Sequence, residues 1–240
     1  MADAATARRA RGDWRALARR WFRRVGLLGI ALAVAPFALT ALYALPGVRP
    51  VSTLMAADAV RLRPFERAWT PLAEMPDALI ASVLASEDGR FCFHDGVDWP
   101  ALNEQARAAL AGEEARGAST VTMQTVKNLF LPARRSMARK AAEVPLAWFA
   151  DRVWGKRRTL EIYLNIAEWA PGAYGAQAGS RFWFGRDVAR LTRSQAARLA
   201  VTLPNPYLRN PADPGPRTAA LARLNEARAR GMGPYLGCLE

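Results

Sequence analysis

The sequence predicts a mainly α protein in which a single N-terminal transmembrane helix is followed by one helical domain. Three observations lead to this prediction. Residues 25–45 form an apolar run without a charged side chain. Beyond residue 70, apolar side chains recur at helical spacing in one segment after another, and the period-two alternation typical of strands is scarce. The 240 residues, of which 51% are hydrophobic, suffice for one domain with an appendage.

The apolar run from Val25 to Leu45 is long enough to cross a membrane. As a helix it would measure about 31 Å, which matches the roughly 30 Å hydrocarbon core of a bilayer. A cleaved signal peptide is the alternative, because Ala33-Val34-Ala35 resembles a cleavage site, but the run continues well past it. Pro36 can kink such a span without preventing it. We therefore expect a membrane anchor.

Residues 1–24 form a basic tail with eight arginines against two aspartates. Because positive charge is retained on the cytoplasmic side of a membrane, the rest of the chain should lie on the outer face. We expect a cytoplasmic tail over 1–24, a transmembrane helix over 25–45, a linker over 46–70 and an extracytoplasmic domain over 71–240. The protein would then be a single-pass protein of the cytoplasmic (inner) membrane, with a periplasmic domain where the cell has a periplasm.

The formal net charge of +13 suggests a polyanionic partner such as nucleic acid, anionic lipid or a phosphorylated substrate. Almost half of that charge lies in the tail, and no nucleic-acid-binding motif is present, so nucleic acid is not an expected partner. Cys92 and Cys238 permit one disulfide in an oxidising compartment, and the sequence leaves its formation open. Without clustered His and Cys ligands, a structural zinc site is not expected.

Predicted helices cover 75–88, 98–110, 120–131, 136–170, 192–203 and 216–231. Asp98 is a candidate cap with Pro100 in the first turn, Thr192 or Ser194 opens the fifth helix, and Gly231 ends the last. Pro145 marks a break or kink within 136–170. Only 65–75 has a weak extended pattern.

The first stretch that carries chemistry is SEDGRFCFHDGVDW, residues 86–99. Glu87 follows Val83 by four residues and Leu84 by three, so it extends the apolar stripe of its helix. Burial beside aliphatic side chains raises the pKa of a carboxyl group and suits it to proton transfer near neutral pH. The alternative is an ordinary acidic helix end, with Asp88 in the following turn.

Two further stretches are polar or cationic. RGASTVTMQTVKN, residues 116–128, crowds hydroxyl and amide groups that can line a sugar or phosphate groove, although Ser119 or Thr120 can equally cap the next helix. RRSMARKAAEVPLAW, residues 134–148, sets basic residues before Glu143. Arg139 and Glu143 can form an i,i+4 ion pair, or the guanidinium groups can clamp a diphosphate.

Together these stretches closely resemble glycosyltransferase family 51, the peptidoglycan glycosyltransferases. Five motifs stand in the family's order from roughly residue 71 to residue 211: EDGRFCFHDGVD, GASTVTMQTVKN, RKAAE, KRRTLEIYLN and LTRSQAARLAVTLPNP. Ala118, Met123, Thr159 and Gln195 depart from the residues usual in these motifs. No SxxK, SxN or KTG transpeptidase motif is present, so we expect glycosyltransferase activity alone.

The resemblance implies a lysozyme-like helical fold with a smaller membrane-proximal lobe, and an enzyme that polymerises lipid II into β-1,4-linked glycan for cell wall biosynthesis. It implies Glu87 as the catalytic base, with Glu143 as a second catalytic carboxylate that orients cations or helps hold a metal. The implied substrate-binding residues are Asp88, Ser119, Thr120, Gln124, Lys127, Asn128, Arg135, Arg139 and Lys140. For His94 a scaffold role is favoured over a catalytic one.

The implied partners are lipid II, the growing lipid-linked strand and the membrane, with cell wall synthesis or division proteins as further candidates. No cofactor is expected to be bound permanently and no protein metal site is assigned, while a divalent cation, Mg²⁺ or Mn²⁺, at the diphosphate is left open. One alternative is a membrane-bound lytic transglycosylase or muramidase that cleaves peptidoglycan. Another is a non-catalytic anchored scaffold. The basic stretch at 133–140 favours synthesis, because cleavage of the polymer has no diphosphate leaving group.

Overall fold

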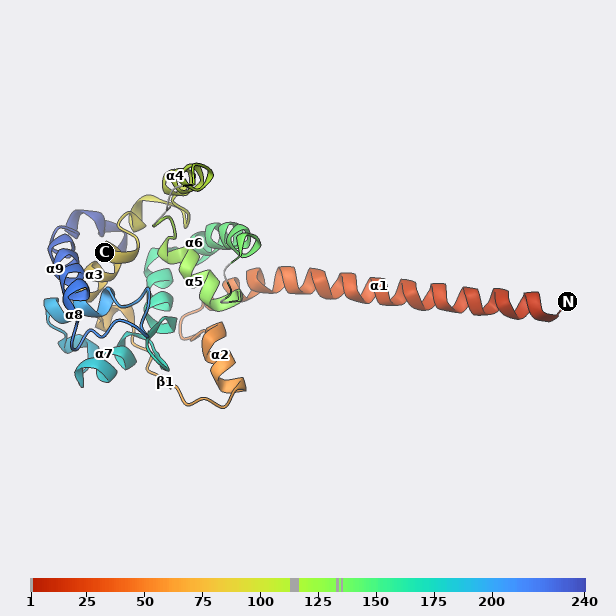
Figure 1. The fold of residues 1–240 in the computed structure, drawn as a ribbon, viewed down its shortest axis with the longest axis horizontal. Coiled ribbons are helices and arrows are strands. Elements are labelled where there is room, and N and C mark those ends of the chain that lie inside the picture. Colours follow the sequence, from red (N-terminus) through yellow and green to blue (C-terminus); the bar gives the residue numbers. More distant parts are fainter. Residues whose placement is uncertain (1, 113–116, 133, 135) are drawn as a thin grey trace. The chain divides into compact units, whose positions relative to one another are not determined.

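The computed structural model describes residues 2–112, 117–132, 134 and 136–240, and for residues 2–16 it describes the backbone alone. The prediction of a mainly α protein is confirmed (Figure 1). The α-helices are α1 (Ala2–Tyr43), α2 (Thr53–Val60), α3 (Asp77–Glu87), α4 (Trp99–Leu110), α5 (Val121–Phe130), α6 (Met137–Ile166), α7 (Ala176–Phe184), α8 (Arg193–Ala200) and α9 (Pro216–Arg230). The 3₁₀ turns are Leu72–Glu74, Phe91–Phe93, Val188–Arg190, Gly233–Tyr235 and Gly237–Leu239.

The described chain divides into two units, residues 1–39 and 40–240. Within α1, the stretch Leu17–Tyr43 is long and apolar enough to cross a membrane, and an 18-residue window in it has a mean hydropathy of 2.3. This agrees with a single N-terminal anchor. The helix ends at Tyr43, two residues before the predicted boundary, just ahead of Pro46 and Gly47, which has a φ of +85°.

The segment 46–70, which we expected to be a linker, belongs to the second unit and packs within it. Ser52 caps α2, and the side chain of Met55 in that helix is fully buried. The Thr53 hydroxyl donates to the backbone oxygen of Asn128 at 3.1 Å. Strand β1 (Glu66–Arg67) then pairs in parallel with β3 (Ala173–Tyr174), which pairs antiparallel with β2 (Glu168–Ala170).

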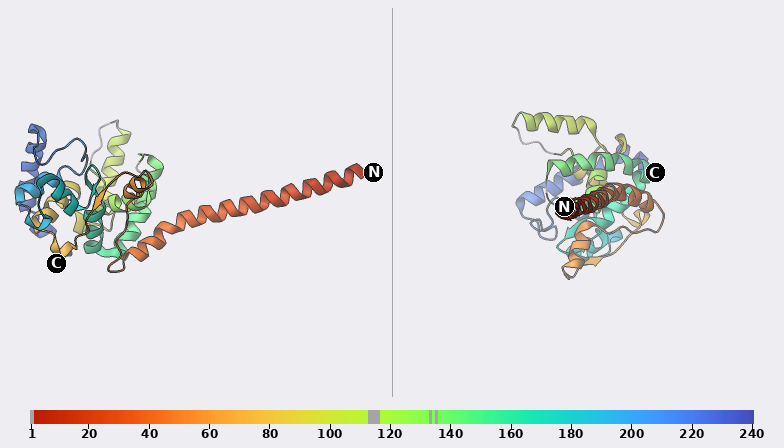
Figure 2. Two further views of the ribbon diagram at one scale, coloured as in Figure 1. Left: turned by 90° about the horizontal axis from the view of Figure 1, so that it is seen from below. Right: turned by 90° about the vertical axis from the view of Figure 1, so that its right-hand side faces the viewer.

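The core of the second unit is built around α3, which packs against α8 and α9 (Figure 1). We predicted an apolar stripe on this helix, but its residues from Leu79 to Leu84 are all buried, so it is surrounded on every side. By contrast, α4 has no buried residue and lies at the edge of this unit, where its yellow-green ribbon stands apart in the right-hand view of Figure 2.

Helix α5 packs along α6, and these two helices carry several of the predicted site residues. We predicted a break or kink at Pro145; helix α6 continues through this residue, so a break there is wrong, while a kink stays a prediction. The non-helical residue is Gly155, with a φ of +66°. A glycine has no Cβ to oppose a positive φ, so the change of direction falls at Gly155. Predicted caps are confirmed at Thr192, which forms a capping box with Gln195, and at Gly231.

The two cysteines are joined. A disulfide links Cys92, in the turn after α3, to Cys238 near the end of the chain, with Cα atoms 5.5 Å apart. It ties the C-terminal segment to the loop that follows Glu87.

Candidate active site

Glu87 is the last residue of α3, and its side chain is largely withdrawn from solvent. The Gln124 amide donates to Glu87 Oε2 at 3.1 Å, and the Ser86 hydroxyl donates to Oε1 at 3.2 Å. Burial raises the pKa of Glu87, while these hydrogen bonds and the positive charges of Lys127 and Arg209 act in the opposite direction. A carboxylate in this environment can accept a proton near neutral pH.

A cleft of about 270 Å³ opens beside Glu87. Its walls come from the end of α3, the turn after it, the start of α4 and the segment before α5. The lining residues are Ser86, Glu87, Asp88, Gly89, Arg90, Asp98, Ala101, Gly117, Ala118, Ser119 and Thr120. The structure therefore brings four of the predicted site residues, Glu87, Asp88, Ser119 and Thr120, to one cleft.

Asp88 is buried and its carboxylate is held within the protein. It accepts the backbone N–H of Val121 at 2.8 Å and lies 3.0 Å and 3.1 Å from His94 Nε2. The His94 side chain is only 4% exposed. These contacts favour a scaffold role for His94, while substrate binding by Asp88 stays a prediction.

The polar residues before and within α5 have local partners as well. Thr120 caps the helix by accepting the N–H of Met123 at 3.0 Å, and its hydroxyl donates to the Gly96 carbonyl at 2.6 Å. The Ser119 carbonyl accepts from Gln124 Nε2 at 3.4 Å. Asn128, on the last turn of α5, is half-buried. Thr120 therefore caps α5, as one of the two interpretations predicted, and it also lines the cleft.

A second, cationic cluster is built around Glu143. This carboxylate is 1% exposed and is paired with Arg139 and, at 3.3 Å, with Lys140. Burial lowers the pKa of Lys127, and the charge of Glu143 counteracts that effect more than any other group. Arg139 and Lys140 lower the pKa of Lys127 further, and Glu87 raises it. Arg135, also predicted as a substrate-binding cation, lies outside the described residues.

Lys127 therefore connects the two halves of the site. Its charge acts both on Glu87 in the cleft and on Glu143 in the cationic cluster. The arrangement offers a proton acceptor beside fixed positive charges, which suits the displacement of an anionic leaving group.

Sequence reasoning missed two residues near Glu87. Tyr163 is 2% exposed and donates from its hydroxyl to Gln124 Oε1 at 3.2 Å. Arg209 follows α8 and contributes a positive charge at Glu87. Tyr163 lies within the motif KRRTLEIYLN, which was the available signal, but only the fold shows its partner.

The described residues do not fit a metal ion held by the protein. Among them no group of three or more His, Cys, Asp or Glu side chains could hold a metal. Glu143, the carboxylate considered for that role, is already occupied by two cations. A divalent cation held by a diphosphate stays a prediction.

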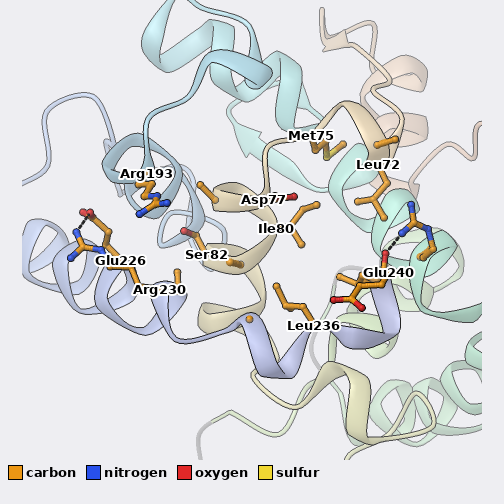
Figure 3. A pocket seen from close by; sticks show the side chains of 17 residues that line it. Leu72, Met75, Asp77, Ile80, Ser82, Arg193, Glu226, Arg230, Leu236 and Glu240 are labelled. Carbon is orange, nitrogen blue, oxygen red and sulfur yellow. Dashed lines mark hydrogen bonds and ion pairs between the residues drawn. The ribbon is translucent and has the colours of Figure 1, made fainter.

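A larger cavity, of about 610 Å³, lies elsewhere, between α3, α9 and the C-terminal segment (Figure 3). Its walls include Met75, Ile80 and Leu236. None of the predicted site residues lines it, and Glu226 at its rim is paired with Arg230 at 2.6 Å. Because the predicted site residues gather at the smaller cleft and none lines this cavity, the smaller cleft is the candidate active site.

The sequence is similar to known proteins over most of its length. A family model described as transglycosylase matches residues 55–230, more than half of the chain. A biosynthetic peptidoglycan transglycosylase of Mesorhizobium japonicum is 52% identical over 98% of this chain and 100% of the relative. A protein with the same description from Agrobacterium fabrum is 50% identical over 95% of this chain and 99% of the relative. Another from Brucella suis is 51% identical over 88% of this chain and 94% of the relative.

Proposed function

The chain belongs to the transglycosylase family, and from that premise we propose that it polymerises lipid II into β-1,4-linked glycan strands with release of undecaprenyl diphosphate. It is a peptidoglycan glycosyltransferase of cell wall synthesis. The observation that carries the proposed mechanism is the place of Glu87 beside the cleft, where its carboxylate is largely withdrawn from solvent and accepts from the Gln124 amide at 3.1 Å.

In the proposed reaction, Glu87 accepts the proton of the acceptor's GlcNAc 4-hydroxyl as that oxygen attacks the anomeric carbon of the donor strand. The bond from this carbon to the diphosphate breaks, so an α linkage is replaced by a β linkage. The raised pKa of Glu87 supports its part, because a base acts best when its pKa approaches the working pH.

Lys127, Arg139 and Lys140 stabilise the negative charge that grows on the departing diphosphate, with Arg135 as a further predicted cation. Glu143 holds Arg139 and Lys140 in place. The Lys140 side chain keeps 26% of its surface exposed, which supports access to an anionic ligand. Fixed charges that need no reorganisation during the reaction accelerate it most.

The direction of the reaction is tested with purified full-length protein and labelled lipid II in detergent. We expect long glycan that a muramidase degrades. Clearing of a peptidoglycan suspension without polymer formation would instead identify a lytic enzyme. A third outcome would identify a scaffold: the protein forms no polymer and clears no peptidoglycan, and the cellular phenotype requires the anchor but survives Glu87→Gln.

The membrane arrangement is part of the same proposal. The apolar stretch Leu17–Tyr43 supports a single-pass anchor, and the arginines of the tail support a cytoplasmic N-terminus in the inner membrane. Protease added to intact spheroplasts should digest the domain from outside and spare the tail, whereas protection of the domain would contradict this orientation. Cell wall synthesis or division proteins stay predicted partners.

A further inference from the structure

The side chain of Gln124 lies between Tyr163 and Glu87 and contacts both. Tyr163, on the second segment of α6, is 2% exposed, and its hydroxyl donates to Gln124 Oε1 at 3.2 Å. The Gln124 amide nitrogen donates to Glu87 Oε2 at 3.1 Å and to the Ser119 carbonyl at 3.4 Å. A continuous chain of hydrogen bonds therefore runs from a buried phenol to the proposed base.

These contacts admit one orientation of the amide. An amide nitrogen can only donate and an amide oxygen can only accept. If the amide of Gln124 were reversed, its oxygen would face two acceptors, the Glu87 carboxylate and the Ser119 carbonyl. The N–H groups would then face the phenol, whose own O–H would lose its acceptor. Because an unsatisfied buried polar group is costly, the two acceptors and the phenol together select the orientation that points N–H at Glu87, and the phenol holds the oxygen end of the amide.

We propose that Tyr163 is a positioning residue, which fixes the amide of Gln124 and through it the carboxylate of Glu87. The inference rests on the proposed role of Glu87 as base and adds a residue that controls it. An N–H donor on Oε2 stabilises the ionised carboxylate and restricts its rotation. Glu87 is thereby kept in the form and direction in which it can accept a proton.

The phenol is suited to this task over the whole working range of pH. Burial and the negative charges of Glu87 and Asp88 raise the pKa of Tyr163 well above its usual range. Its O–H therefore stays protonated and remains a donor. The other charged groups that act on Glu87 are Lys127 from α5 and Arg209 from the segment after α8. Neither is altered when the Tyr163 hydroxyl is removed.

The test compares Tyr163→Phe with the wild type in the full-length protein. Loss of the hydroxyl removes the donor that holds Gln124 Oε1, so the Gln124 side chain can move and Glu87 loses its N–H donor for part of the time. The pKa of Glu87, followed by ¹³C NMR of its carboxyl carbon in the free enzyme, should rise by about one unit. The acid limb of kcat/KM for lipid II polymerisation should move to higher pH by a similar amount. Tyr174→Phe is the matched control, because Tyr174 is 1% exposed and its hydroxyl binds Asp58 at 2.7 Å.

A second background separates positioning from general destabilisation. In Gln124→Met the pKa of Glu87 should already be raised, and adding Tyr163→Phe should shift it no further. The inference would be overturned if Tyr163→Phe raised the pKa of Glu87 in the Gln124→Met protein as much as it does in the wild type. It would also be overturned if Tyr163→Phe alone left the pKa of Glu87 unchanged. Absence of polymer from the wild type would refute the proposed function instead, and the NMR titration would still decide the effect of Tyr163.

Discussion

The carboxylate of Asp88 accepts the backbone N–H of Val121 at 2.8 Å, and this hydrogen bond joins the end of α3 to the first turn of α5. The same carboxylate binds His94 at 3.0 Å. The residue beside the proposed base therefore fixes two chain segments that border the cleft. Glu87 and Gln124, which lie on these two helices, can meet only if this junction holds.

Asp88→Ala should weaken the junction. The substitution leaves the N–H of Val121 and Nε2 of His94 without their buried acceptor, which should lower the free energy of unfolding by about 2 kcal/mol. Polymerisation should fall as well, because Glu87 is displaced. Thermal unfolding and a lipid II assay measure both effects. Asp77→Ala, at the exposed start of the same helix, is the control, and equal effects of the two variants would refute a special role for this junction.

Glu143→Gln should impair catalysis and change its pH dependence. The negative charge of Glu143 raises the pKa of Lys127, which burial lowers. Without that charge the pKa of Lys127 falls further, so Lys127 loses its proton at lower pH. The alkaline limb of the rate profile should therefore move to lower pH, and activity near neutral pH should fall by about tenfold or more.

The control for this variant is Glu226→Gln, which removes a comparable i,i+4 partner, that of Arg230 on α9. It should leave the rate profile unchanged, because the charges that act most strongly on Lys127 and Glu87 come from other segments than α9. An unmoved alkaline limb in Glu143→Gln would show that Lys127 is not the titrating cation.

The Cys92–Cys238 disulfide should stabilise the fold more than it affects the chemistry. It closes a loop between residues 146 positions apart, and loss of a long-range bond of this kind typically costs about 2–5 kcal/mol. Thermal unfolding with and without reductant should differ for the wild type and coincide for Cys92→Ser/Cys238→Ser. Equal melting temperatures of the oxidised and reduced wild type would contradict this expectation.

Much of the fold follows from local pattern. The apolar run after the arginines predicts the N-terminal helix, and Thr192 and Gly231 mark helix ends by chemistry that acts within a few residues. The folding of 46–70 onto the domain depends instead on distant partners, such as the Asn128 carbonyl that Thr53 contacts. The non-helical residue of α6 is Gly155, because a glycine can adopt a positive φ at little cost. The sequence pattern predicted the irregularity at Pro145 instead.

In the candidate site, too, some features could be predicted from the sequence and others could not. The position of Glu87 on its helix, together with the order of the motifs, predicts a base and most of the residues proposed around it. The burial of Glu143 and the pairing of both Arg139 and Lys140 with it could not be deduced, because an i,i+4 pair on an exposed helix has the same spacing. Tyr163 was overlooked for a similar reason, since its partner Gln124 is 39 positions away.

The most direct measurement of the central claim is the rate of lipid II polymerisation by Glu87→Gln, beside Glu74→Gln as an exposed acidic control. The amide is nearly isosteric but cannot accept the proton, so the rate should fall by about 10² or more while the melting temperature is maintained. Glu74→Gln should polymerise like the wild type. A Glu87→Gln protein that is folded and polymerises lipid II at the wild-type rate would show that Glu87 is not the base.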